Sequence, residues 1–144
     1  MSQPTPAQAA GTSIQGYIQR IKSLPSLQEL TAEKLVEMTR SLGKRFAEKK
    51  VPASQIYKFH EHIIRLATNV SAGRVEPSEA KILSYHLSYA AARITNVDQR
   101  NAMKELASFF DAALEKTGTA GDIVRLRQIS EAVVAYHKFF GGRN

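Results

Sequence analysis

VAYHKFFGGR, residues 134–143, is the stretch of this sequence that decides the fold. It closes a longer segment, from Thr119, in which apolar side chains recur three and four positions apart, the spacing of one helix face. These side chains are Ile123, Leu126, Ile129, Val133, Tyr136 and Phe140. The glycine pair that follows ends the helix. The sequence therefore predicts a long terminal helix whose apolar face anchors the core of the protein.

The composition is that of one cysteine-free domain. With 144 residues, the chain is long enough to bury roughly 68–70% of the surface that its unfolded form exposes. It contains no cysteine, which excludes thiol catalysis, disulfides and cysteine-bound zinc. No apolar run approaches the roughly 18–20 residues that span a bilayer, and the start MSQPTPAQAAGTS lacks the pattern of a signal peptide. We therefore expect a soluble, cytoplasmic protein with no membrane partner.

The net charge is positive and locally concentrated. Twenty Lys and Arg residues oppose thirteen Asp and Glu residues, which gives +7 at pH 7 and a pI near 9.8. This balance favours a polyanionic partner, and nucleic acid before others. From Arg40 to Lys58 the local charge is +5, with Glu48 as the single acid. Solvated lysines are the ordinary explanation of such a cluster, and the functional one is a surface that neutralises backbone phosphates without reading sequence.

The chain divides into an N-terminal arm and one helical domain. Residues 1–12 are uncharged and poor in large apolar side chains, so we expect a disordered arm. Residues 13–144 are expected to form the helical bundle domain. Apolar spacing, caps, prolines and glycines predict helices over residues 13–24, 31–50, 52–70, 77–95, 96–117 and 119–140. The predicted fold class is all-α, a single-domain bundle of about five long helices plus a short N-terminal helix.

Each of the middle helices has a predicted buried stripe. In chain order the stripes are Leu35, Met38, Leu42 and Phe46; Ile56, Phe59, Ile63, Leu66 and Val70; Ile82, Leu83, Leu87, Ala90 and Ile94; and Met103, Leu106, Phe110 and Leu114. Tyr57, Tyr85 and Tyr89 fall at or near core positions, so we expect their rings to pack inside rather than form an exposed stacking surface. Gly43 lies mid-helix, where it costs about 1 kcal/mol relative to alanine, and this indicates a bend or a close backbone approach.

No arrangement of residues indicates catalysis or metal binding. His60 and His62 are two positions apart on a helix and point in different directions, and no second ligand three or four residues away accompanies them. The carboxylate pairs lie on predicted solvated faces, with no nucleophile or phosphate loop nearby. We therefore expect no enzyme activity, no metal and no cofactor. His137, beside the terminal apolar stripe, is expected to be packed or hydrogen-bonded.

Four short segments resemble one known family. The most specific is AYHKFFGG at the end of the terminal helix, and LTAEKL and SQIYKF, at residues 30–35 and 54–59, resemble the two opening helices of that family. A fourth segment follows the pattern Leu-Ala-Tyr-Ala-x-x-Arg, with Ser88 in place of the first alanine and matches at Leu87, Tyr89, Ala90 and Arg93. From Thr31 to Arg143 the chain thus resembles the small subunit of the type III-A CRISPR–Cas (Csm) effector complex.

The resemblance implies a non-catalytic subunit in RNA-guided antiviral defence. In that family, several copies stack head-to-tail beside the subunits that hold the guide RNA, and together they line the groove in which target RNA pairs with the guide. The implied partners are the guide and target RNA backbones, the other Csm subunits and further copies of the same chain. Candidate RNA contacts are Lys44, Arg45, Lys49, Lys50, Lys58, Arg65 and Arg93. Of these, Arg93 rests on a matched segment and the others on charge and helix geometry.

Two other functions are compatible with the residues alone. One is a helical protein-interaction adaptor whose basic surface docks onto an acidic partner. The other is a non-specific nucleic-acid-binding bundle outside CRISPR. Salt-sensitive binding to RNA would separate both from the small-subunit hypothesis.

Overall fold

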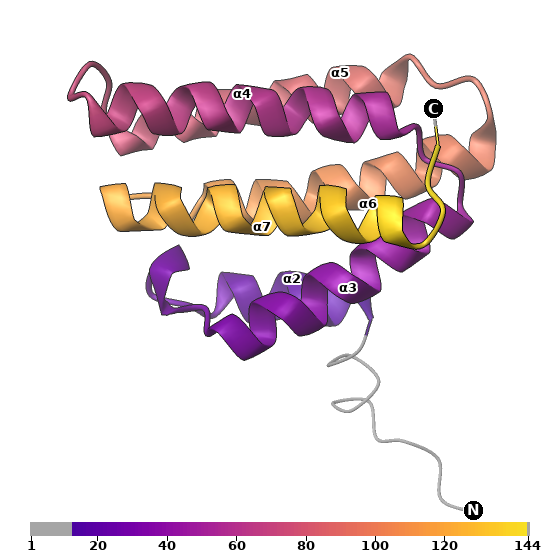
Figure 1. Ribbon diagram of the computed structural model, residues 1–144, viewed down its shortest axis with the longest axis horizontal. Coiled ribbons are helices and arrows are strands. Elements are labelled where there is room, and N and C mark those ends of the chain that lie inside the picture. The colour runs from indigo at the N-terminus through magenta and orange to yellow at the C-terminus, as the bar shows by residue number, and fades with distance from the viewer. Residues whose placement is uncertain (1–12, 144) are drawn as a thin grey trace, which may run out of the picture.

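Residues 13–143, the part of the chain that the computed structural model describes, form six α-helices and two 3₁₀ helices without strands (Figure 1). The elements are α2 (Ile14–Lys22), η1 (Leu27–Glu29), α3 (Ala32–Glu48), α4 (Ala53–Ser71), η2 (Pro77–Leu83), α5 (Ser84–Ala92), α6 (Val97–Leu114) and α7 (Ala120–Phe139). The predicted all-α fold class is confirmed. The arm predicted for residues 1–12 lies outside the described residues.

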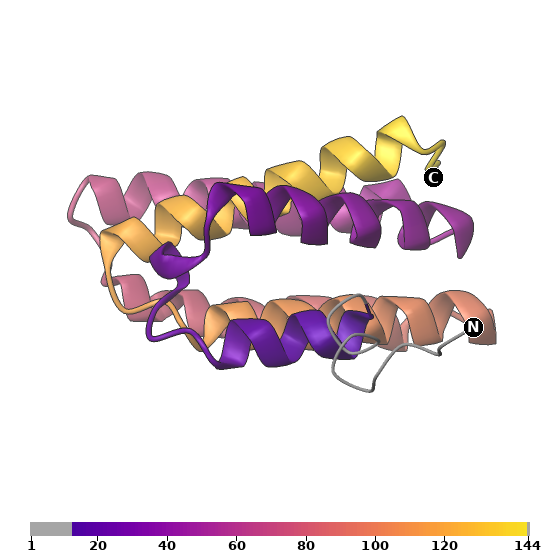
Figure 2. The same cartoon turned by 90° about the horizontal axis from the view of Figure 1, so that it is seen from below.

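The α-helices pack in two layers of three (Figures 1 and 2). One layer holds α3, α7 and α4, and the other holds α2, α6 and α5. The terminal helix α7 is central in its layer and contacts both α3 and α4, while α6 lies behind it and contacts α2 and α5. The apolar core fills the space between the layers. Its largest fully buried side chains include Phe46, Phe109, Phe110, Met103 and Leu106.

Helix starts agree with the capping residues expected from the sequence. The Thr31 hydroxyl accepts a hydrogen bond from the backbone N–H of Lys34, and the Asn96 side chain accepts one from Gln99. At α7, Thr119 and Asp122 form a reciprocal capping box, in which each side chain accepts from the backbone N–H of the other. These caps fix where α3, α6 and α7 begin.

Gly43 allows α3 and α7 to approach closely, as expected from its mid-helix position. A Cβ atom at this glycine would lie 2.7 Å from the backbone nitrogen of His137 and 2.8 Å from the carbonyl carbon of Tyr136. Backbone atoms cannot move aside as a flexible side chain can, so only glycine fits here. Helix α3, which carries basic residues, therefore packs closely against the C-terminal end of α7.

The helix predicted for residues 77–95 was wrong in its length and continuity. The structure has a 3₁₀ helix, Pro77–Leu83, followed by the short α5, and the α-helix ends at Ala92. A period of three places Ala80 and Leu83 on one buried side, and this leaves Ile82, which was predicted to be buried, 48% exposed. The bundle therefore has four long α-helices and two short ones among its described residues.

The expected burial of three tyrosines was also wrong. The rings of Tyr57, Tyr85 and Tyr89 are exposed, with exposed fractions of 53%, 60% and 66%. On α5 the two tyrosines are four residues apart and lie on the face opposite the buried Leu87, so they share an outward stripe. Three further side chains that were predicted to be buried are only partly so: Leu66, Val70 and Ile94.

At the end of α7, the buried position belongs to His137 rather than to the aromatic residues beside it. Tyr136 and Phe140 are half-buried, whereas His137 is 1% exposed. Because α3 and α4 cover α7 from two sides, its buried face is wider than one apolar stripe and includes Ser130 and His137. The expectation that His137 is packed and hydrogen-bonded is confirmed, since its Nε2 donates to the carbonyl oxygen of Val51 at 2.9 Å.

Candidate nucleic-acid interface

All seven side chains predicted to contact RNA are exposed, but they form two separate groups. One group is on α3 and the turn that follows it: Lys44, Arg45, Lys49 and Lys50. The other is on α4 and at the end of α5: Lys58, Arg65 and Arg93. In their layer α7 lies between α3 and α4, whereas the turn that holds Lys49 and Lys50 leads from α3 to α4 (Figure 1).

The turn after α3 holds two of these lysines outward. Val51 is fully buried, and its backbone N–H donates to the carbonyl of Phe46 at 2.9 Å, which closes the end of the helix. Lys50, immediately before it, has a positive φ of 60°, the left-handed conformation that commonly ends a helix. Lys49 and Lys50 therefore protrude into solvent from a turn anchored by a core residue.

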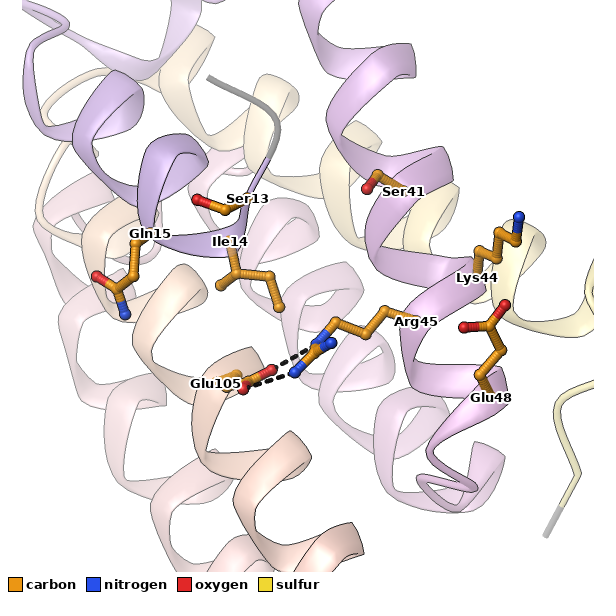
Figure 3. Close-up of a pocket in the computed structure, with 8 residues that line it drawn as sticks. All are labelled: Ser13, Ile14, Gln15, Ser41, Lys44, Arg45, Glu48 and Glu105. Carbon is orange, nitrogen blue, oxygen red and sulfur yellow. Dashed lines mark hydrogen bonds and ion pairs between the residues drawn. The ribbon is translucent and has the colours of Figure 1, made fainter. Parts of the chain in front are cut away.

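Arg45 lies in a cleft of about 540 Å³ between α2, α3 and α6, where it points toward Glu105 (Figure 3). Its Nε and one terminal nitrogen donate to the two carboxylate oxygens of Glu105 at 2.7 and 2.9 Å. These hydrogen bonds to Glu105 raise the pKa of Arg45. The pair compensates the charge of Arg45 within the molecule, and this leaves Lys44, Lys49 and Lys50 as the stronger phosphate candidates of the group.

Arg40 belongs to the basic cluster of the sequence but is not among the predicted RNA contacts. The Arg40 guanidinium lies 5.9 Å, and the Lys44 ammonium 6.0 Å, from the centroid of the Phe140 ring. Next to this ring, Phe139 is 73% exposed and packs edge-on against Phe140 at 5.0 Å. The spacing of Arg40 and Lys44, four residues apart on an exposed helix face, was the available signal.

Two cations of the second group, Lys58 and Arg93, border a small cleft between α4 and α5, with a volume of about 80 Å³. His62 and His86 stack across it with ring centroids 4.1 Å apart, and the Arg93 guanidinium lies 5.5 Å from the centroid of the Tyr89 ring. Burial lowers the pKa of His62, and the neighbouring charges of His86, Arg65 and Lys58 lower it further. The residues that line this cleft include two cations and no carboxylate.

The other two histidines take part in packing. His60 Nδ1 and the Ser130 hydroxyl are hydrogen-bonded at 2.6 Å between α4 and α7. Burial lowers the pKa of His60 and of His137, so both rings favour the neutral form. Within residues 13–143, no group of three or more His, Asp or Glu side chains is placed to hold a metal ion. No helix of the described chain is long and apolar enough to cross a membrane.

The fold and surface define a class, namely a small all-α bundle with exposed cations in two groups and histidines engaged in packing. Within this class, the sequence model of one family, described as Csm2 Type III-A, matches residues 29–143. The chain therefore belongs to the Csm2 Type III-A family and is a subunit of the type III-A Csm effector complex. The resemblance seen in the sequence is confirmed. Comparisons with curated proteins and with solved structures gave no match.

Proposed function

We propose that this protein is the non-catalytic small subunit of a type III-A CRISPR effector complex, stacks in several copies, and contacts the backbone of guide and target RNA. The observation that carries the proposal is the family match over residues 29–143. It is supported by the exposed cations of the two groups, with Lys44, Lys49 and Lys50 on α3 and the turn after it, and Lys58, Arg65 and Arg93 on α4 and at the end of α5. The complex would act in the cytoplasm.

The surface chemistry favours phosphates over bases for the α3 group. Lysines at a turn and on an outer helix face are point charges that can approach a backbone from many directions, and such contacts carry no sequence information. Binding of this kind releases counterions and therefore weakens steeply with salt. A subunit that must accept any guide sequence needs this kind of contact.

The arrangement of polar side chains supports a non-catalytic role. His60 and His137 are engaged in buried hydrogen bonds, and the buried carboxylate of Asp122 accepts from the backbone. These groups act in folding, so they are unsuited to proton transfer at the surface. Stacking of copies needs two different patches on one molecule, and the two layers of the bundle present different helices to solvent.

The test is a fluorescence anisotropy titration of the full-length chain with single-stranded RNA, guide–target RNA duplex and duplex DNA at several salt concentrations. We expect RNA binding whose log–log salt slope is near −0.7 for each phosphate contacted on a single strand. A variant with Lys44, Lys49 and Lys50 changed to Glu should bind RNA about tenfold or more weakly and lose roughly three such contacts from the slope. Arg45 is kept in this variant because it pairs with Glu105.

The matched control changes Lys22, Lys104 and Lys116 to Glu, an equal change in net charge on the layer of α2 and α6 and the turn after α6. It should lose less RNA affinity than the first variant, and both should keep the helicity and melting temperature of the parent chain. Equal losses in the two variants would show that net charge alone, rather than the α3 group, governs binding. Absence of RNA binding by the parent chain at low salt would contradict the RNA contacts, and co-purification with the other Csm subunits would then show whether its basic surface faces protein.

A further inference from the structure

A row of exposed side chains runs along the outer face of η2 and α5. Ile82, Tyr85 and Tyr89 are 48%, 60% and 66% exposed, and Arg93 follows four residues after Tyr89. Steps of three and four residues keep these side chains on one helix face. Large apolar side chains exposed singly are ordinary on protein surfaces, but three of them aligned on one face indicate a binding surface.

The neighbouring rings and charges indicate what this surface binds. Tyr85 contacts His86 with ring centroids 4.7 Å apart, and His86 stacks on His62 at 4.1 Å, so three rings adjoin one another across α4 and α5. Arg93 holds its guanidinium beside the Tyr89 ring, 5.5 Å from the centroid. Lys58 borders the same cleft from α4, and no carboxylate lines it.

This combination fits a nucleic acid better than a protein. A purely apolar partner would be met by cations at the rim with no acid among the residues that line the cleft, and the desolvation of these cations would be costly. A single-stranded nucleic acid has a matching group for both the rings and the cations. Each base has a face that stacks on an aromatic ring, and each phosphate carries a negative charge that pairs with Lys or Arg. Bases inside a duplex have no free face, so the surface requires unpaired nucleotides.

We propose that the face formed by Tyr85, Tyr89, Lys58 and Arg93 stacks unpaired RNA bases on its tyrosine rings and holds the adjacent phosphates with its two cations. This inference rests on the proposed function and deepens it, because it names the form of RNA that the α4–α5 group contacts. The two tyrosines are attached to the helix about 6 Å apart along its axis, given a rise of 1.5 Å per residue. Neighbouring bases of an extended strand could therefore each meet one ring.

The experiment measures binding of the full-length chain to a single-stranded oligouridine over a series of salt concentrations. Tyr89→Ala should weaken binding about tenfold without changing the salt slope, because it removes stacking and no phosphate contact. Tyr89→Phe keeps the ring and should bind within twofold of the parent chain. Lys58→Ala and Arg93→Ala should each reduce the slope by about 0.7. Tyr57→Ala, which removes an exposed tyrosine outside the cleft, is the matched control and should bind like the parent chain.

A second readout comes from the tyrosines themselves. The chain has five tyrosines and no tryptophan, so its intrinsic emission is that of tyrosine alone. Stacked bases should quench this emission when RNA binds, and the double variant Tyr85→Phe/Tyr89→Phe should keep its affinity while losing most of the quenching. Quenching of unchanged size in the double variant would mean that RNA meets other tyrosines, and this would overturn the proposal.

The outcomes separate this inference from the proposed function. RNA binding by the parent chain with unchanged affinity in Tyr89→Ala would leave the proposed function intact and overturn the stacking surface. If Tyr89→Ala keeps its RNA affinity but no longer co-purifies with the other Csm subunits, the tyrosines belong to a protein interface. A loss in Tyr57→Ala equal to that in Tyr89→Ala would also overturn the assignment to this face. If the parent chain does not bind RNA at all, the proposed RNA contacts and this surface fail together.

Discussion

Helices α7 and α5 lie in different layers and use their large and polar side chains in opposite ways. In α7 the polar groups Asp122, Ser130 and His137 are buried, and each has a hydrogen-bond partner outside α7. In α5 two large rings, Tyr85 and Tyr89, are turned to solvent although the helix has few other large side chains. The difference indicates that α7 determines stability, whereas α5 offers a surface that the fold does not need.

The largest effect on stability is expected at Asp122. Its oxygens accept hydrogen bonds from the backbone N–H groups of Gln28 at 2.9 Å, Gly118 at 2.8 Å and Thr119 at 3.0 Å. Asp122→Ala would leave these donors without that partner, so we expect a loss of about 3 kcal/mol in the free energy of unfolding, measured by urea denaturation. Asp98→Ala, which removes an exposed carboxylate from the first turn of α6, should cost less than about 1 kcal/mol. Equal costs at the two positions would contradict a special role for α7.

The same carboxylate should contribute to acid sensitivity. Burial raises the pKa of Asp122, but the hydrogen bonds from the backbone of Gln28, Gly118 and Thr119 outweigh it, so the pKa lies below its usual value. A lowered pKa means that the stabilisation is present above the unfolded-state value of about 3.9 and is lost as the pH falls through the folded-state value. Below pH 4, the parent chain should therefore lose more stability than Asp122→Ala.

A smaller loss is expected when α3 and α7 are forced apart. Gly43→Ala places a Cβ within 2.7 Å of the His137 backbone nitrogen, and this overpacking should cost about 2 kcal/mol. The cost should appear even though alanine favours a helix by about 1 kcal/mol over glycine. Gly118→Ala is the control, since its nearest new contact is Asp122 Oδ2 at 3.9 Å. A Gly43→Ala variant as stable as the parent would show that the two helices can separate without loss.

The sequence was sufficient for features that depend on neighbours along the chain. The caps Thr31, Asn96 and Thr119 bond to N–H groups three residues away, so the residue pattern alone locates them. The mid-helix Gly43 was a usable signal for a close approach because its cost in a helix needs compensation. The fold class could be predicted for the same reason, because the spacing of apolar residues along the chain indicates helices.

Features that depend on distant parts of the chain could not be predicted in the same way. The pairing of Arg45 with Glu105 joins residues sixty positions apart, so charge counting could not show that this cation is compensated. The exposure of Tyr85 and Tyr89 depends on α5 being the outer helix of its layer, with no element of residues 13–143 covering its far face. From the sequence alone, a large aromatic ring is expected to lie in the core, and only the packing of the layers shows that these two rings are exposed.

A modest pH effect is expected from the two buried histidines. Burial lowers the pKa of His60 and of His137, although the hydrogen bond to Val51 partly offsets the effect at His137. Below the unfolded-state value of about 6.5 the unfolded chain binds more protons than the folded chain, so stability falls as the pH is lowered. Urea denaturation at pH 7.5, 6.5 and 5.5 should show this decline, and His137→Gln should make it shallower. An identical decline in His137→Gln would mean that His137 is not involved.

The smallest effect on stability is expected on α5, and it is the most direct test of the comparison. Tyr85→Ala and Tyr89→Ala remove rings that are mostly exposed. Tyr85→Ala should change the free energy of unfolding by about 0.5 kcal/mol or less. Tyr89→Ala should change it by up to about 1 kcal/mol, because it also removes the contact with Arg93. Thermal melting of these variants, followed by circular dichroism, should match that of the parent chain. A loss as large as that of Gly43→Ala would show that the rings support the α4–α5 packing, and any fall in RNA affinity would then have to be attributed to the fold. Unchanged melting together with reduced RNA affinity would instead show that the two tyrosines act in RNA binding and not in the stability of the bundle. A side chain that the fold does not need, but that RNA binding does need, must act by contacting the RNA.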